Sequence, residues 1–312
     1  MLLTITAAAA ASSGCGQLRG RKMIQDANEL YRKGRYVEAV SLYERAEPLV
    51  PELAVLWLNK GYTCRQLLGP ATSPRAGARP GVEASPENRR WGTCALDAFA
   101  RVKQLAPRDP RGEQLYMQTL FDINDFGTLE AIFLAQGQAA LRRGVVDLDA
   151  ATGLQQVYFK QGKWTEALAW ARKAADARPT DADAQYRLGS FIWQLLSSRG
   201  GGSEMMAFDP RTGSAGGGGG GAGGAVARPQ RAAPDDITGP LRIELADEGI
   251  RYLERALTLR PQHPEAMIYL NLLYRQKSLA LFAEPDKWQA AIDKANEWQK
   301  KGFQARGGIA KL

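Results

Sequence analysis

The sequence has few of the residues on which catalytic and metal sites depend. It contains one histidine, His263, and three cysteines among 312 residues. A nucleophilic triad or a zinc site needs several histidines, cysteines or clustered carboxylates. Cys64 and Cys94 belong to no Cys-x-x-Cys pair, and His263 lies in Pro-Gln-His-Pro, where we expect a surface turn. The sequence therefore predicts no catalytic residues, no metal site and no enzyme activity of its own.

The motifs of cofactor-binding and nucleic-acid-binding proteins are also missing from the sequence. The run Gly216 to Gly221 lacks the Gly-Lys-Ser/Thr of a phosphate-binding loop, and no strand pattern precedes it. The formal charge is +8, from 41 basic and 33 acidic residues, but no run of five like charges occurs. Charges scattered in this way are typical of a solvated surface. We therefore predict no cofactor and no nucleic-acid partner.

Stretches in which Val and Ile alternate with polar residues are almost absent, so little β-structure is expected. Helix-forming Ala, Leu, Arg, Gln, Lys and Glu dominate instead. The chain is 45% hydrophobic and longer than one usual domain, which is ample for a packed core. These features predict an all-α protein.

A pattern of two helices joined by a turn recurs along the chain. In GKWTEALAWARKAADARPTDADAQYRLG (162–189), Ala167 and Ala174 place small side chains on one face of a helix, where a second helix can approach. Pro179 ends that helix, and Gly189 lies on the inner face of the next one. The same layout occurs at two other places, around Ala39, Ala46, Pro51 and Gly61, and around Ala256 and Pro261.

Spacing turns this likeness into a repeat, because Met23 and Trp57 occupy equivalent positions 34 residues apart, as do Ala151 and Gln185. A period of 34 in helix-turn-helix units is the signature of the tetratricopeptide repeat, or TPR. The chain resembles a TPR protein over most of residues 21–310. The resemblance implies an α-solenoid, or superhelix, of about six units over residues 20–303. We place these units at 20–53, 54–109, 111–146, 148–181, 182–263 and 264–303.

Two long segments interrupt the repeat. Pro51 and Pro107 are one period plus 22 residues apart, and Pro179 and Pro261 are one period plus 48 residues apart. The additional residues lie within 69–91, which is rich in Pro and Gly, and within 198–239, which is rich in Gly. Such compositions bury too little apolar surface to offset their chain entropy. We predict mobile loops at the turn inside a unit, the second one disordered, where they leave the stack of repeats intact.

The first 19 residues are interpreted as a leader, since MLLTITAAAAASSGCGQ begins with an apolar stretch too short to span a bilayer. The stretch resembles a bacterial lipoprotein signal, in which the cysteine after small residues, here Cys15, is lipidated. A cleaved signal and an alanine-rich leader without a targeting role are the alternatives. In an oxidising compartment Cys64 and Cys94 are able to pair, but both also suit buried positions as small hydrophobic residues. Residues 304–312 are expected to form a tail.

In TPR proteins the first helix of each unit lines a concave groove that accepts an extended peptide or a partner helix. Aromatic and arginine side chains contribute disproportionately to interface energy, and a basic, aromatic groove suits an acidic or C-terminal peptide segment. The resemblance implies ten candidate groove residues: Asn59, Tyr62, Arg65, Gln156, Lys160, Tyr186, Arg187, Trp193, Tyr269 and Arg275.

The sequence thus predicts a non-enzymatic scaffold that binds a protein or peptide partner in the bacterial cell envelope. Contact with the membrane is expected only through a lipid anchor at Cys15. A cytoplasmic adaptor or regulatory module, and an accessory subunit of an enzyme complex, are the alternatives.

Overall fold

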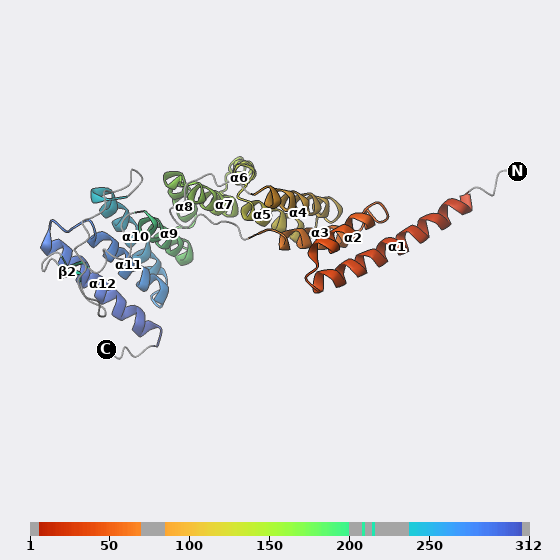
Figure 1. Cartoon of the computed structure of the whole chain (residues 1–312). Coiled ribbons are helices and arrows are strands. Elements are labelled where there is room, and N and C mark those ends of the chain that lie inside the picture. Colours follow the sequence, from red (N-terminus) through yellow and green to blue (C-terminus); the bar gives the residue numbers. More distant parts are fainter. Residues whose placement is uncertain (1–5, 70–84, 200–207, 210–213, 216–236, 308–312) are drawn as a thin grey trace. The chain divides into compact units, whose positions relative to one another are not determined.

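The computed structural model describes residues 6–69, 85–199, 208–209, 214–215 and 237–307, with side chains from residue 15 onward. The chain divides into two compact units, Met1–Arg75 with Arg79–Ile132 and Ala76–Ala78 with Phe133–Leu312. In each unit, α-helices pack against helices that neighbour them in the sequence (Figure 1). The predicted all-α fold built from helix-turn-helix units is thereby confirmed.

The first unit is built from helices of 11 to 27 residues: α1 (Thr6–Arg32), α2 (Tyr36–Ala46), α3 (Ala54–Gln66), α4 (Pro86–Leu105) and α5 (Pro110–Asp122). Each of these helices packs against the next one along the chain. The next helix, α6 (Phe126–Leu141), contains the division between the units, which falls before Phe133.

The second unit continues with α7 (Leu148–Lys160), α8 (Trp164–Asp176), α9 (Ala182–Ser198), α10 (Gly239–Leu259), α11 (Pro264–Ser278) and α12 (Pro285–Ala305). Consecutive helices from α7 to α12 pack together, and α9 also packs directly against α11. First helices of successive pairs therefore lie side by side here. Two short strands, β1 (Phe208–Asp209) and β2 (Ser214–Ala215), pair antiparallel with Phe208 opposite Ala215.

The turn inside a short-linked helix pair uses one residue with a left-handed backbone. Gly34 follows α1 with φ of 73°, and Gly162 follows α7 with φ of 80°. In both turns the next N–H, of Arg35 or Lys163, donates to the carbonyl five residues earlier and so closes the end of the helix. Asn124 takes this place between α5 and α6 with φ of 59°, a conformation that asparagine tolerates.

Apolar side chains fill the spaces between successive helices. In the first unit, one cluster around Tyr43 and Leu56 joins α1, α2 and α3, and a second around Phe99 joins α3, α4 and α5. In the second unit a larger cluster, which includes Leu188 and Ile192, extends from α7 to α11. Each helix is therefore stabilised by the helices before and after it, as in repeat proteins generally.

Glycine allows the two helices of a pair to approach closely. A Cβ atom at Gly61 of α3 would lie 2.5 Å from a ring carbon of Phe99 in α4. A Cβ atom at Gly189 of α9 would lie equally close, 2.5 Å, to Cγ of Leu253 in α10. Carbon atoms pack no closer than about 3.5 Å without repulsion. These two glycines are thus required by packing.

Most of the residues predicted to have structural roles in the repeat are either buried at helix contacts or exposed in turns. The small residues Ala39, Ala46, Gly61, Ala167, Gly189 and Ala256 are buried, and the prolines Pro51, Pro179 and Pro261 are exposed. Ala174 differs from the expectation, because it is only half-buried, whereas Ala171 and Ala175 of α8 are buried. The packed face of α8 thus runs through Ala167, Ala171 and Ala175, at a spacing of four residues.

The first insert is shorter than the predicted range 69–91. Helix α4 begins at Pro86, and the hydroxyl of Ser85 accepts a hydrogen bond from the N–H of Asn88. A serine cap followed by proline is a strong helix start, and it places the buried Trp91 inside α4. Residues 70–84 lie outside the described residues.

Three other predicted boundaries also shift. The leader 1–19 is not a separate segment in the described part, because α1 runs from Thr6 to Arg32 without a break. The insert 198–239 begins inside α9 and ends at the start of α10, and Ile237 before it is buried. Residues 200–207, 210–213 and 216–236 lie outside the described residues, as do residues 308–312 of the predicted tail 304–312, whose first two residues belong to α12.

A disulfide joins the helix pair that the first insert separates. Cys64 of α3 and Cys94 of α4 are bonded, with their Cα atoms 6.0 Å apart, and Cys64 is fully buried. Of the two readings of these residues, pairing is therefore the one that the structure adopts. Cys15 is a free and exposed cysteine on α1.

Candidate partner-binding face

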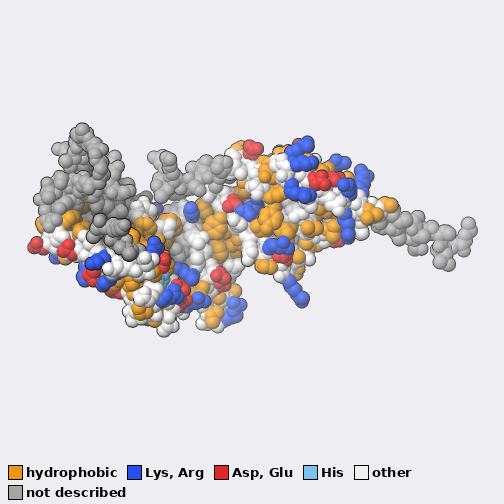
Figure 2. Space-filling view, turned by 90° about the horizontal axis from the view of Figure 1, so that it is seen from below, with side chains coloured by type: hydrophobic (Ala, Val, Ile, Leu, Met, Phe, Trp, Pro, Cys, Tyr) orange, Lys and Arg blue, Asp and Glu red, His pale blue; other side chains and the backbone are white. Residues whose placement is uncertain are grey.

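The described residues contain no cluster of three or more His, Cys, Asp or Glu side chains that is able to hold a metal ion. Among the helices that the structure describes, none combines the length and the apolar character that crossing a membrane requires. On the face shown in Figure 2, basic and acidic side chains lie among one another over the described residues. The search for a functional site therefore turns to packing surfaces between helices.

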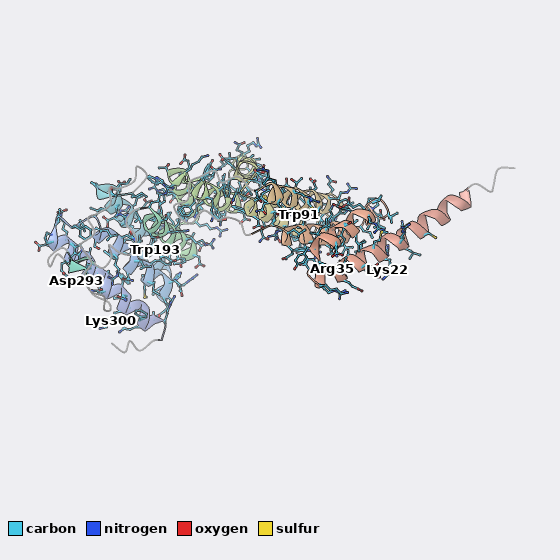
Figure 3. All side chains as sticks on the ribbon, in the orientation of Figure 1. Lys22, Arg35, Trp91, Trp193, Asp293 and Lys300 are labelled. Carbon is cyan, nitrogen blue, oxygen red and sulfur yellow. A yellow bond between two sulfur atoms is a disulfide. The ribbon has the colours of Figure 1, made fainter. Side chains whose placement is uncertain are left out.

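Three predicted groove residues meet where α9 packs against α11. The ring centroids of Tyr186 in α9 and Tyr269 in α11 are 5.7 Å apart, and those of Trp193 and Tyr269 are 5.2 Å apart. Both pairs have the near-perpendicular geometry that aromatic rings favour. All three side chains are only partly buried, so the cluster has an open side. We call Tyr186, Arg187, Trp193, His263 and Tyr269 the α9–α11 face; Figure 3 labels Trp193 on it.

His263 belongs to this face, contrary to the expectation of a surface turn residue. Its side chain is only 7% exposed, and its ring stacks on Tyr186 with centroids 4.7 Å apart. Nδ1 of His263 accepts a hydrogen bond from the N–H of Ala266 and so caps the start of α11. Carboxylates flank the ring, with Glu265 at 3.3 Å from Nδ1 and Asp183 at 3.9 Å from Nε2. Packing of α11 on α9 buries the turn.

The capping role of His263 follows a pattern along the chain. Asp109, Asp147 and Asp181 cap α5, α7 and α9, each through its carboxylate. His263 occupies the equivalent position before α11. This equivalence is visible in the sequence, since each capping residue directly precedes the first helix of a pair. It is the signal by which a structural role for His263 could have been found.

The aromatic part of the face differs from its rim in polarity. Nε1 of Trp193 is inaccessible and has no hydrogen-bond partner among the described residues. Burial raises the pKa of the Tyr186 hydroxyl above its ordinary value, with Tyr269 and Glu265 acting in the same direction. At the rim Arg187 is exposed. The pKa of Asp183 is lowered mainly by its hydrogen bonds from Arg260, at 2.8 and 3.1 Å.

Arg275 of α11 lies apart from the aromatic cluster and contacts α12. Its guanidinium donates to Oδ1 of Asn271 at 2.8 Å, to Oδ1 of Asn296 at 2.9 Å and to Oε1 of Gln299 at 3.1 Å. Burial lowers the pKa of Arg275 below its ordinary value, but arginine stays charged at any physiological pH. The three amide acceptors carry no charge, so they solvate the cation without neutralising it.

The predicted groove residues of the first unit hold neighbouring helices together. Nδ2 of Asn59 donates to Oδ1 of Asn28 at 3.0 Å, and the same oxygen accepts from the Tyr43 hydroxyl at 2.6 Å. Tyr62 packs edge-on against Phe99, with centroids 6.0 Å apart.

Arg65 of α3 is likewise engaged, because it donates to Asp122 at the end of α5 at 2.6 and 3.1 Å and to Gln118 at 3.2 Å. The remaining two candidates, Gln156 and Lys160 of α7, are exposed. The structure thus brings together only the candidates on α9 and α11, with Arg275 at a separate position on α11.

Comparison with known proteins adds fold-level likeness only. No family model matches the sequence, and no curated protein matches it. Among solved structures, a monomeric IFIT1 mutant with Gppp-AAAA has 14% identity and a TM-score of 0.38, covering 91% of this chain, which spans 50% of the IFIT1 chain. MamA has 13% identity and a TM-score of 0.27, with coverage of 94% and 98% of the two chains.

YrrB, described as a TPR protein with an unusual peptide-binding site, has 14% identity and a TM-score of 0.27, covering 91% of this chain and 89% of its own. These identities and scores are low, so no conclusion about what this chain binds rests on them.

Proposed function

We propose that this protein is a non-catalytic scaffold that binds a protein partner through the α9–α11 face. One observation carries the proposal: aromatic side chains from two adjacent first helices meet in a cluster with an open side, beside the exposed Arg187. Tyr, Trp and Arg are the residue types that most often contribute large binding energies at interfaces. Partly buried rings are already ordered in the free protein, so binding loses little further side-chain entropy.

The chemistry of the face favours an acidic segment of the partner. Arg187 presents a guanidinium at the rim that pairs with carboxylates through two parallel hydrogen bonds. The rings of Tyr186 and Trp193 offer apolar surface beside it. A partner segment with a carboxylate next to an apolar side chain satisfies both parts of the face.

We further propose that the protein acts in the cell envelope. The disulfide between Cys64 and Cys94 supports this location, because disulfides persist in exported proteins and are rare in the reducing cytosol. Cys15 is free and exposed, as a lipidated residue must be. Labelling cells with an alkyne fatty acid tests the anchor: wild type should be labelled and Cys15→Ala should not, whereas equal labelling or none in both would contradict lipidation at Cys15.

Site-specific photo-crosslinking tests the binding face in living cells. A benzophenone amino acid at position 187 is expected to give a discrete crosslinked adduct. The matched control is position 251, since Arg251 is an equally exposed arginine on α10, outside the face. Adducts of equal yield at both positions, or at position 251 alone, would place the binding surface elsewhere.

Substitutions then measure the contribution of the face to partner affinity. Arg187→Glu combined with Trp193→Ala should weaken binding of the crosslinked partner at least tenfold, or about 1.4 kcal/mol. Arg251→Glu should leave it unchanged. Trp193→Phe keeps an aromatic ring and removes an N–H that has no partner in the free protein, so its stability should match wild type. Unchanged affinity in the double variant would refute the proposed role of the face.

A further inference from the structure

A crevice in the second unit lies between α10, α11 and α12, apart from the α9–α11 face. Its volume is about 430 Å³, within the range of small-molecule sites. Its walls come from Ile243 of α10, Tyr274 and Lys277 of α11, and residues of α12 and of the turn before it. No residue of α9 lines it.

The floor of the crevice is apolar. Leu281 and Ala291 line it and are 4% and 6% exposed, and they belong to a small cluster with Trp288, against which Ile243 packs. Because α10 and α12 both pack on α11, their side chains leave an apolar slot above α11. Fully closing such a slot with a methylene chain stabilises the complex by about 0.8 kcal/mol for each CH₂ group.

The rim of the crevice carries three ammonium groups, those of Lys277, Lys287 and Lys294. Lys277 pairs with Asp247 at 2.7 Å and Lys294 with Glu297 at 2.9 Å, and Lys287 pairs with Glu284 on the same rim. An ammonium group has three N–H donors, so each single ion pair leaves donors for a further anion. Three cations from two helices thus converge on the mouth of an apolar slot.

We propose that this crevice binds a linear amphiphilic anion, that is, an unbranched apolar chain ending in one carboxylate. The chain lies over Ile243, Leu281 and Ala291, and the carboxylate accepts hydrogen bonds from Lys277, Lys287 and Lys294. The two parts of the site match the two parts of such a ligand. A short anion lacks the chain for the floor, and an uncharged amphiphile leaves the ammonium groups without an additional acceptor.

Dodecanoate is the probe, titrated below its micelle concentration into the full-length protein and followed by calorimetry. The methyl resonance of Ile243, assigned through Ile243→Val, reports occupancy of the slot itself. We expect one saturable site and a shift of this resonance. Acetate, which has no chain, and dodecyl maltoside, which has no charge, should each bind at least about tenfold more weakly, or 1.4 kcal/mol.

Two sets of variants locate the binding. Lys287→Glu/Lys294→Glu should weaken dodecanoate binding at least tenfold, about 1.4 kcal/mol. The matched control, Arg251→Glu/Lys300→Glu, makes the same charge change at exposed residues outside the crevice and should bind normally; Figure 3 labels Lys300 on α12. Ala290→Phe adds a ring at an exposed lining position with all charges kept, and should also block binding.

Several outcomes overturn the proposal. They are no saturable binding of dodecanoate, equal weakening in the matched control, or acetate binding as tightly as dodecanoate. A peptide with aliphatic residues before a free C-terminal carboxylate is the remaining comparison. Tighter binding of that peptide than of dodecanoate would replace the proposed amphiphile by a protein C-terminus.

Discussion

Replacing residues 200–236 by a four-residue Gly-Ser linker is expected to leave the second unit folded and to stabilise it. The two ends of this segment are already joined in the structure, because the N–H of Ile237 donates to the carbonyl of Arg199 at 2.8 Å. A linker of four residues spans at least about 13 Å when extended, far more than a hydrogen-bonded pair of residues requires. The fold therefore tolerates a short connection at this point.

Arg242 of α10 holds both ends of the segment in place. This residue is 2% exposed, and its guanidinium donates to the carbonyl of Ile237 at 2.8 Å, of Leu196 at 3.3 Å and of Arg199 at 3.4 Å. It also donates to Oε1 of Gln276. The C-terminal carbonyls of α9, which have no partner within the helix, are thereby satisfied.

The magnitude follows from chain entropy. The free energy of closing a loop grows as about (3/2)RT ln n, so shortening roughly 37 residues to four lowers it by about 2 kcal/mol. We expect the free energy of unfolding to rise by up to this amount, as measured by urea unfolding followed by circular dichroism at 222 nm. Arg242→Met, in contrast, should lower it by about 2 to 3 kcal/mol, because buried carbonyls lose a donor.

A deletion variant that loses more than about 1 kcal/mol would refute this reasoning, since it would show that residues 200–236 stabilise the core. The effect of Arg242→Met separates two causes. If the stem is closed by Arg242, the substitution should cost the same in the deleted and the full-length protein. A much smaller cost in the full-length protein would mean that the segment itself closes the stem.

Three further predictions concern the first unit. Reducing the Cys64–Cys94 disulfide, which closes a loop with a sequence separation of 30, should lower the free energy of unfolding by about 3.5 kcal/mol on the chain-entropy model; equal unfolding curves with and without reductant would show that the bond contributes nothing. Gly61→Ala should cost about 2 to 3 kcal/mol because its Cβ would meet Phe99, whereas Gly34→Ala, where nothing lies within 4 Å but φ is 73°, should cost about 1 kcal/mol; the reverse order in urea unfolding would contradict the packing. Burial raises the pKa of Tyr43 from 10.0 to about 12, so its neutral form is favoured in the folded protein, and its contribution to stability is complete below pH 10 and lost as the pH rises toward 12. Tyr43→Phe should remove this part of the alkaline loss, and an unchanged pH profile of unfolding in that variant would count against it.

The repeat could be predicted from the sequence because its signals are local. Gly34 and Gly162 occupy turns that need a positive φ, and Pro179 and Pro261 stand in the connections after a helix pair. Such residues act through their own backbone, so their effect does not depend on the rest of the fold. The choice of Ala174 over Ala175 failed for a related reason, since spacing alone fixes the phase of a helix face only to within about one residue.

The candidate site could be predicted only in part, because it depends on which helices meet. Tyr186, Trp193 and Tyr269 face one another since α9 packs on α11, and the same contact buries His263. Asn59 and Tyr62 occupy the corresponding part of α3, but they are engaged by Asn28 and Phe99. A position in a repeat therefore predicts the direction of a side chain, whereas its availability to a partner depends on neighbours that differ from unit to unit.

The two inserts also explain features that the repeat itself does not require. Both replace the short turn inside a helix pair, between α3 and α4 and between α9 and α10. Lengthening a three-residue turn to roughly 19 or 40 residues raises the loop-closure free energy by about 1.6 and 2.3 kcal/mol, respectively. Each interrupted pair carries a link near the ends of its insert that the short-turn pairs of the described chain do not use.

In the first pair this link is the disulfide between Cys64 and Cys94, and in the second it is the buried guanidinium of Arg242. A disulfide contributes about 2 to 4 kcal/mol and several hydrogen bonds to a charged donor contribute a similar amount. Either link is therefore large enough to offset the closure of its loop. The two links act by different chemistry on the same problem, so reductant should weaken only the first helix pair and Arg242→Met only the second.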